Sequence, residues 1–209
     1  PVLVGLAWLI VLLLPVCALA VLTVREPEAP PRQRIPLREG ARHLWRNGPM
    51  KRILLITLLV HFGESFRNAV SVFFIRDIVG IGTIGSVYFM YFAAGIAAIP
   101  SWLWLGRKVG KHRAFVGTLV VVGLVSAANF PLTQGDHELF FMLFLLKGFC
   151  FGGLQFLPLA MLADVVDVDS LRSGGRRAGT YFALVGMMVK LAIAFGTGSS
   201  LIVVGALGF

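Results

Sequence analysis

Charged side chains inside long apolar runs are the residues of this chain that can do chemistry. Lys190 lies near the middle of the apolar run 178–206, and Lys147 lies inside another, 138–163. A cation at mid-membrane depth costs about 2.5–3.5 kcal/mol even on lenient insertion scales. Each lysine therefore either pairs with an acidic residue inside a helix bundle or faces a transport cavity.

A second charged group lies in the apolar run 53–75. His61, Glu64 and Asn68 have the i, i+3, i+7 spacing of one helix face, and Glu64 and Arg67 form an i, i+3 pair that can neutralise itself. Two interpretations are open. The group is an internal salt bridge that orients the helix, or it lines a cavity in which Glu64 or His61 takes up a proton and Arg67 donates to sugar hydroxyls.

These residues must be positioned by membrane-spanning helices. Of the 209 residues, 57% are hydrophobic and 14% are charged, with a mean hydropathy of +0.86. Soluble domains are only about 45–50% apolar. A helix crosses a bilayer with about 20 mostly apolar residues. Six segments qualify, at residues 2–24, 53–75, 84–105, 114–132, 138–163 and 178–206. The predicted fold is an all-α integral membrane bundle with six transmembrane helices.

The distribution of basic residues between the spans predicts their orientation. The linker 25–52 carries eight Arg and Lys against three Glu, and the segments 106–113 and 164–177 carry four and three basic residues. The turns near 76–83 and 131–138 are almost free of them. By the positive-inside rule, the three basic segments are cytoplasmic, and the protein is multi-pass in the cell inner (plasma) membrane. The net charge of +9 thus reflects topology, and no nucleic-acid partner is expected.

The ends of the chain indicate a piece of a longer protein. The sequence opens without Met inside one apolar run and stops directly after another. Between the first two spans, the prolines of the linker stop the helix, and a short helix at the membrane surface is expected from Leu37 to Trp45.

Uncharged side chains in the spans are interpreted more simply. Cys17 and Cys150 lie in apolar runs and are expected to be small core residues. The aromatic residues Tyr88, Tyr91 and Trp102 are expected mostly to face lipid or to lie at the membrane interface. A ring that stacks on a sugar is the alternative for the two tyrosines.

The segment 164–177 combines charges in a way that suits a gate. Asp164 and Asp167 lie one turn apart at the inner end of a helix, close in sequence to Arg176 and Arg177. Ion pairs at a cytoplasmic mouth can form in one state and break in another, which alternating access requires.

The same region carries a family resemblance. The run ADVVD at 163–167 is followed by SGGRRAG at 173–179 and by a helix that contains Lys190. This pattern resembles the loop before the eleventh helix of the glycoside-pentoside-hexuronide:cation symporters of the major facilitator superfamily. Their pattern is roughly A-[DE]-x-x-D, a gap, T-G-x-R-x-E-G and a later lysine. The segments WRNGPMKR, FFIRDIVG and GRKVGKHR also agree, so the resemblance covers almost the whole chain.

The resemblance implies a domain organisation. The six segments look like helices six to eleven of the twelve in a major facilitator-type bundle. Residues 1–24 then form the last helix of the amino-terminal half and residues 25–52 the central cytoplasmic linker. Residues 53–209 form a carboxy-terminal transporter half that lacks its final helix.

Roles for individual residues follow from the same resemblance. Lys190 matches the lysine that links the sugar and cation sites. The positions that match the cytoplasmic gate are Asp164, Asp167, Arg176 and Gly179, with Arg177 as a neighbouring basic residue. The family glutamate before the last glycine is Ala178 here, which removes one gate partner. Glu64, Arg67 and Lys147 match no family motif and indicate a changed substrate.

The implied function is cation-coupled secondary transport, driven by Na⁺ or H⁺, of a glycoside, pentoside or hexuronide. The alternative on the same scaffold is a symporter of a lysolipid or other amphiphile, whose phosphate would engage Lys147 or Lys190. A membrane-embedded enzyme is less favoured, because the histidines are scattered and no HExxH or GxSxG motif is present.

The sequence also bears on cofactors and partners. The chain should have no catalytic residue, no metal site and no cofactor apart from the coupling cation. The resemblance places the main site of that cation in the amino-terminal half. The expected partners are a small-molecule sugar and the lipid bilayer, and the full-length protein should be monomeric.

Overall fold

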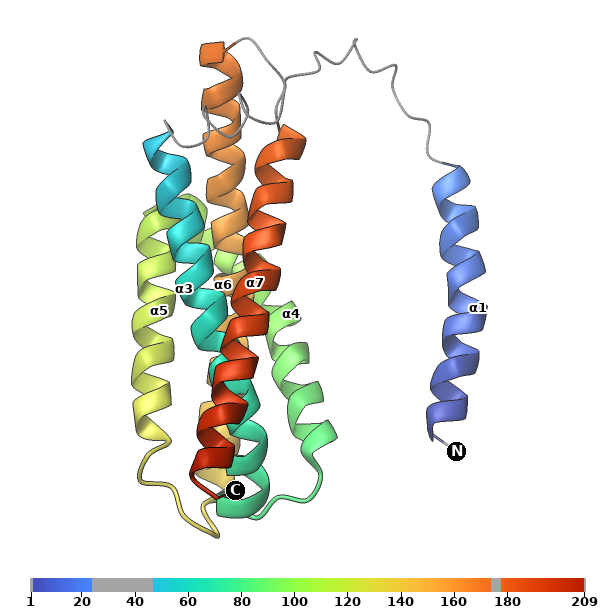
Figure 1. Cartoon of the computed structure of the whole chain (residues 1–209), viewed down its shortest axis with the longest axis vertical. Helices are drawn as coiled ribbons and strands as arrows, with labels where there is room; N and C mark the ends of the chain where they lie inside the picture. The colour runs from blue at the N-terminus through green and yellow to red at the C-terminus, as the bar shows by residue number, and fades with distance from the viewer. Residues whose placement is uncertain (1, 24–46, 174–177, 209) are drawn as a thin grey trace. The chain divides into compact units, whose positions relative to one another are not determined.

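The computed structural model describes residues 2–23, 47–173 and 178–208, and these are helical apart from short turns. The chain divides into two units after Pro36. The first contains α1 (Val2–Leu22). The second contains α3 (Gly48–Phe73), the π-helix η1 (Phe74–Val79), α4 (Ile84–Val109), α5 (Lys111–Ala128), α6 (His137–Ser173) and α7 (Ala178–Ala206) (Figure 1). No strand occurs in the described residues.

The expected all-α membrane architecture is confirmed. Five helices are long and apolar enough to cross a bilayer: α3 with η1, α4, α5, α6 and α7. The first unit adds α1, whose 21 residues reach about 30 Å at 1.5 Å per residue. The last span begins and ends where the sequence predicted, at Ala178 and Ala206.

Two segments predicted as loops are mostly helical, which is a correction. In 106–113, α4 continues to Val109 and α5 begins at Lys111, so Gly110 alone makes the turn, with φ of +96°. Glycine suits this position because other residues are strained at such angles.

In 164–177, α6 continues to Ser173 and reaches 37 residues. At about 55 Å, α6 is much longer than a hydrocarbon layer of about 30 Å. Its carboxyl end therefore projects beyond the hydrocarbon layer, where charged residues such as Asp164 and Asp167 are solvated without ending the helix. The surface helix predicted at 37–45 lies outside the described residues.

Helices α3 and α7 lie side by side, drawn in cyan and red in Figure 1. At their amino-terminal ends, Asn47 caps α3 by accepting from the Met50 N–H, and its amide donates to the Tyr181 hydroxyl at 3.1 Å. Farther along, Gly196 lies against the Phe62 carbonyl, where an added β-carbon would stand 2.6 Å from the oxygen. The two contacts show that α3 and α7 run parallel.

Helices α4 and α6 also run parallel, in contact along a seam of small residues. A β-carbon on Gly148 would lie 2.5 Å from the Tyr91 carbonyl oxygen, and one on Gly152 would lie 2.5 Å from the Gly95 oxygen. The spacing of Gly148 and Gly152 is the GxxxG pattern that lets membrane helices approach closely. This seam fixes which face of α6 meets α4.

We expect Gly148→Ala to destabilise the protein. The added methyl meets backbone rather than a flexible side chain, so helix α4 must shift, at a cost of about 1–3 kcal/mol. The measurement is the unfolding free energy of the purified full-length protein in mixed micelles. Gly123→Ala in α5 is the matched control, because nothing lies within 4 Å of its added β-carbon. Equal stability of the two variants would contradict the close seam.

Candidate substrate site

An ion pair inside the bundle confirms the predicted pairing on α3. The Arg67 Nη2 lies 2.6 Å from Glu64 Oε2, and Arg67 Nε donates to Glu64 Oε1 at 3.3 Å. The two side chains are only 18% and 12% exposed. A two-pronged contact of this kind is the strong form of a charged hydrogen bond. It reduces the cost of holding both charges away from water.

Tyr91 of α4 joins this pair. Its hydroxyl accepts from Arg67 Nη2 at 3.3 Å, and its ring is 1% exposed, packed against Phe144 and Phe151 of α6. The expectation that this residue faces lipid is wrong. Tyr91 lies on the face of α4 that carries Gly95, and the close glycine seam turns that face toward α6.

Trp102 lies farther along the same face, and the expectation that it faces lipid is wrong as well. Its side chain is 7% exposed, and its indole N–H donates to the Phe149 carbonyl at 2.8 Å.

Lys147 of α6 is the third charged residue at this level. Its neighbour Gly148 packs on Tyr91, and its ammonium interacts electrostatically with both Arg67 and Glu64. The side chain is 5% exposed, yet it has no hydrogen bond or ion pair with any residue the structure describes. Helices α3, α4 and α6 thus bring together one carboxylate and two cations.

Polar atoms without partners lie beside these charges. Within the described part of the chain, Arg67 Nη1 and Asn68 Oδ1 are buried and unpaired. One turn away, the Tyr88 and Ser71 hydroxyls lie 2.7 Å apart, and both donate to the Asn68 carbonyl. Unsatisfied buried polar atoms are costly, so they mark places where water or a ligand fits. We call Glu64, Arg67, Asn68, Tyr91 and Lys147 the central cluster.

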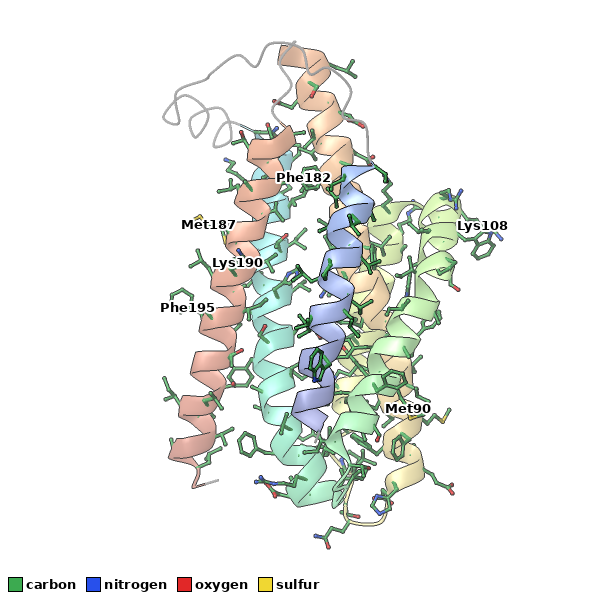
Figure 2. The ribbon with its side chains drawn as sticks, turned by 90° about the vertical axis from the view of Figure 1, so that its right-hand side faces the viewer. Met90, Lys108, Phe182, Met187, Lys190 and Phe195 are labelled. Atoms are coloured by element: carbon green, nitrogen blue, oxygen red, sulfur yellow. The ribbon has the colours of Figure 1, made fainter. Side chains whose placement is uncertain are left out.

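His61 and Lys190 lie elsewhere. His61 Nδ1 is 2.9 Å from the Thr57 carbonyl of its own helix, within hydrogen-bonding distance. Lys190 is exposed on α7 between Met187 and Phe195, whose side chains point away from α3 (Figure 2). From the parallel register of the two helices, Lys190 lies about 12 Å closer to their amino-terminal ends than Glu64. The structure therefore separates the predicted site residues into a central cluster, a histidine on the same helix and an exposed lysine.

An ion pair between the amino-terminal end of α5 and the carboxyl-terminal part of α6 was not predicted. Lys111 Nζ lies 2.6 Å from both carboxylate oxygens of Asp164 and 3.2 Å from the Ala160 carbonyl. Of the other predicted gate residues, Asp167 and Gly179 are exposed, and Asp167 has no ion pair with the described residues. Arg176 and Arg177 lie outside the described residues, so their pairing stays a prediction.

A cavity of about 660 Å³ opens beside this ion pair. Its polar lining comes from the amino-terminal ends of α3 and α5 and the carboxyl end of α6: Asn47, Arg52, His112, Asp164 and Asp169. Apolar side chains such as Ile53 and Met161 also line the cavity. No group of three or more His, Cys, Asp or Glu that could hold a metal ion occurs in the described ranges.

Apolar spans around a buried, partly unsatisfied charge cluster define a multi-pass membrane protein with an internal polar site. The comparison with protein families agrees: residues 1–209 match the family described as MFS/sugar transport protein. The chain belongs to this family of the major facilitator superfamily, as the sequence resemblance indicated. The family is one of transporters, not of enzymes.

Two curated relatives carry matching names. An isoprimeverose transporter of Lactiplantibacillus pentosus is 25% identical over 84% of this chain and 37% of its own length. An uncharacterized symporter of a Synechocystis strain is 23% identical over 78% of this chain and 30% of its own length. The chain thus spans about a third of the length of the curated relatives it matches. No solved structure matches it significantly.

We expect Glu64→Gln to destabilise the full-length protein strongly, because it leaves Arg67 without its carboxylate partner. Removing one partner of a buried pair typically costs about 3–5 kcal/mol. The double variant Glu64→Gln/Arg67→Gln should lose at least about 1 kcal/mol less than the sum of the single variants. The measurement is the same unfolding free energy. Additive losses would show that the pair is not coupled.

Proposed function

We propose that the full-length protein to which this chain belongs is a secondary transporter that moves a glycoside, pentoside or hexuronide, coupled to Na⁺ or H⁺, by alternating access. The observation that carries the proposal is the central cluster. Glu64, Arg67 and Lys147 are charged side chains in the middle of apolar spans: Lys147 is buried, the Glu64 and Arg67 side chains are 12% and 18% exposed, and Arg67 Nη1 is buried without a partner. Such residues in a membrane mark a substrate or ion path. Membership of a sugar transport family supports the same function.

The central cluster is our candidate for the sugar site. Arg67 and Lys147 offer donors to hydroxyl or carboxylate oxygens, and Asn68 offers a free acceptor. Tyr91 holds Arg67 in place and closes one side of the site with its ring. His61, one or two turns toward the cytoplasm, is a candidate for proton uptake on the way to the site.

Lys190 has a different role in this proposal. It lies on an exposed face of α7 in the described part of the chain. An exposed cation at this depth needs a counter-charge in lipid. We propose that the amino-terminal half covers this face and supplies the acidic residues of the coupling-cation site. Lys190 then links that site to the sugar, as the family resemblance implies.

The cytoplasmic gate is proposed to include Asp164, Asp167, Arg176, Arg177 and Gly179, with Lys111 as an added member. The Lys111–Asp164 pair is exposed to 36% and 59%, and exposed pairs contribute only about 0.2–1 kcal/mol. A contact of this strength can break during each transport cycle. It also borders the cavity through which a substrate would leave.

The domain organisation proposed for the full-length protein follows the sequence. Residues 1–24 end the amino-terminal half, 25–52 form the cytoplasmic linker, and 53–209 belong to the carboxy-terminal half. The protein would be monomeric in the plasma membrane, with residues 25–52, 106–113 and 164–177 on the cytoplasmic side.

Uptake into proteoliposomes tests the proposed function. The full-length protein should accumulate at least one labelled sugar from a glycoside, pentoside and hexuronide panel when a Na⁺ or H⁺ gradient is imposed. Lys190→Ala should abolish accumulation against the gradient, because the two sites are no longer linked. Accumulation at the wild-type level in this variant would contradict the role of Lys190. Failure to move any sugar would overturn the proposed function.

Asp164→Asn tests the gate. We expect uptake to change severalfold while the unfolding free energy falls by less than about 1 kcal/mol, since the pair is exposed. The exchange Lys111→Asp/Asp164→Lys restores the ion pair in reverse and should recover part of the activity. Glu138→Gln, at the other end of α6, is the matched control. If the exchange is no better than Asp164→Asn, the pair does not gate transport.

A further inference from the structure

The spans described here carry more positive than negative charge in their interior. Apart from the ends of the spans and the projecting carboxyl end of α6, which carries Asp164, Asp167 and Asp169, the charged side chains of the described spans are one carboxylate, on Glu64, and three cations, on Arg67, Lys147 and Lys190. Glu64 is bound through both oxygens by Arg67. Lys147 is therefore left without a partner carboxylate among the described residues, although it is almost fully buried.

The unpaired atoms of the central cluster fit an anionic group. Arg67 uses Nε and Nη2 for Glu64 and Tyr91, which leaves the buried Nη1 unpaired. Lys147 adds three N–H donors on the neighbouring helix. A carboxylate has two oxygens that accept from two such cations at once, and such hydrogen bonds are about twice as strong as neutral ones. Sugar hydroxyls can also accept from these donors, but they leave the excess positive charge uncompensated.

We propose that the sugar moved by this protein carries a carboxylate, as uronic acids and their glycosides do, and that Lys147 and Arg67 bind that carboxylate. This inference rests on the proposed function and narrows its substrate class. The bound anion balances the second cation of the cluster, so binding removes the cost of a buried, unpaired charge. Asn68 Oδ1 remains free to accept from a sugar hydroxyl.

Matched pairs of sugars test the proposal on the full-length protein in proteoliposomes. Methyl glucuronide and methyl glucoside differ only in the carboxylate, as do methyl galacturonide and methyl galactoside. We expect kcat/KM for one acidic sugar to exceed that of its neutral partner at least about tenfold. Lys147→Gln should abolish most of this preference. Lys108→Gln, whose lysine stacks on Trp104 at the end of α4, is the control and should keep it.

The preference is a ratio measured on the same vesicles, so a smaller amount of folded variant does not change it. Equal or better uptake of the neutral sugars by the wild type overturns the inference and leaves sugar transport intact. If Lys147→Gln keeps the wild-type preference for the acidic sugar, Lys147 does not bind the carboxylate. A group other than the substrate then balances the charge of Lys147. Uptake of neither sugar class, with uptake of labelled lysophosphatidylglycerol instead, overturns the sugar function itself.

Discussion

The cost of a charge in the membrane interior is the constraint on which this structure depends. Arg67 is tolerated because Glu64, one turn away, accepts from it at two atoms, and because Tyr91 accepts a further bond from the next helix. The Tyr91 contact needs α3 and α4 to come close, and the Tyr91 ring is in turn packed against Phe144 and Phe151 of α6. The close approach of α4 and α6 is permitted by the seam of Gly95, Gly148 and Gly152. The packing of these glycines thus helps to position Tyr91, which bonds to Arg67.

The ion pair in the middle of the bundle and the ion pair near its end differ in strength, and this difference suits a transporter. In the middle, the side chains of the ion pair are only 12% and 18% exposed, and Arg67 bonds to Tyr91, whose ring packs against Phe144 and Phe151. Toward the carboxyl end of α6, the ion pair of Lys111 and Asp164 is exposed to solvent and weak, beside a cavity. A protein that alternates between two openings needs contacts of the second kind at its mouth and a preformed site of the first kind at its centre.

Much of this architecture could be predicted from the sequence, because hydropathy and loop charge report directly on spans. The span at 178–206 and the Glu64–Arg67 pair are local features and were found as expected. Tyr91 and Trp102 were expected to face lipid, but they face another helix. Residues at both kinds of position are apolar in a membrane protein, so the helical periodicity of apolar residues does not distinguish them. The partner of Asp164 lies 53 residues away, beyond any local pattern. In the sequence, the charge on Lys111 counts only as one of the basic residues that set the orientation of the spans, so it gives no indication of an ion pair.

Transport as proposed requires that the central cluster line a cavity that the substrate enters. The most direct measurement is labelling of a single cysteine at Asn68 in a full-length protein free of Cys17 and Cys150, using a membrane-impermeant thiol reagent. Leu146→Cys, at an exposed position of α6, is the comparison. We expect Asn68→Cys to be labelled in the absence of sugar and to be protected by a transported sugar. Labelling of Leu146→Cys should be the same with and without sugar. If Asn68→Cys is not labelled, or if a transported sugar leaves its labelling unchanged, the central cluster does not line a cavity that the substrate enters.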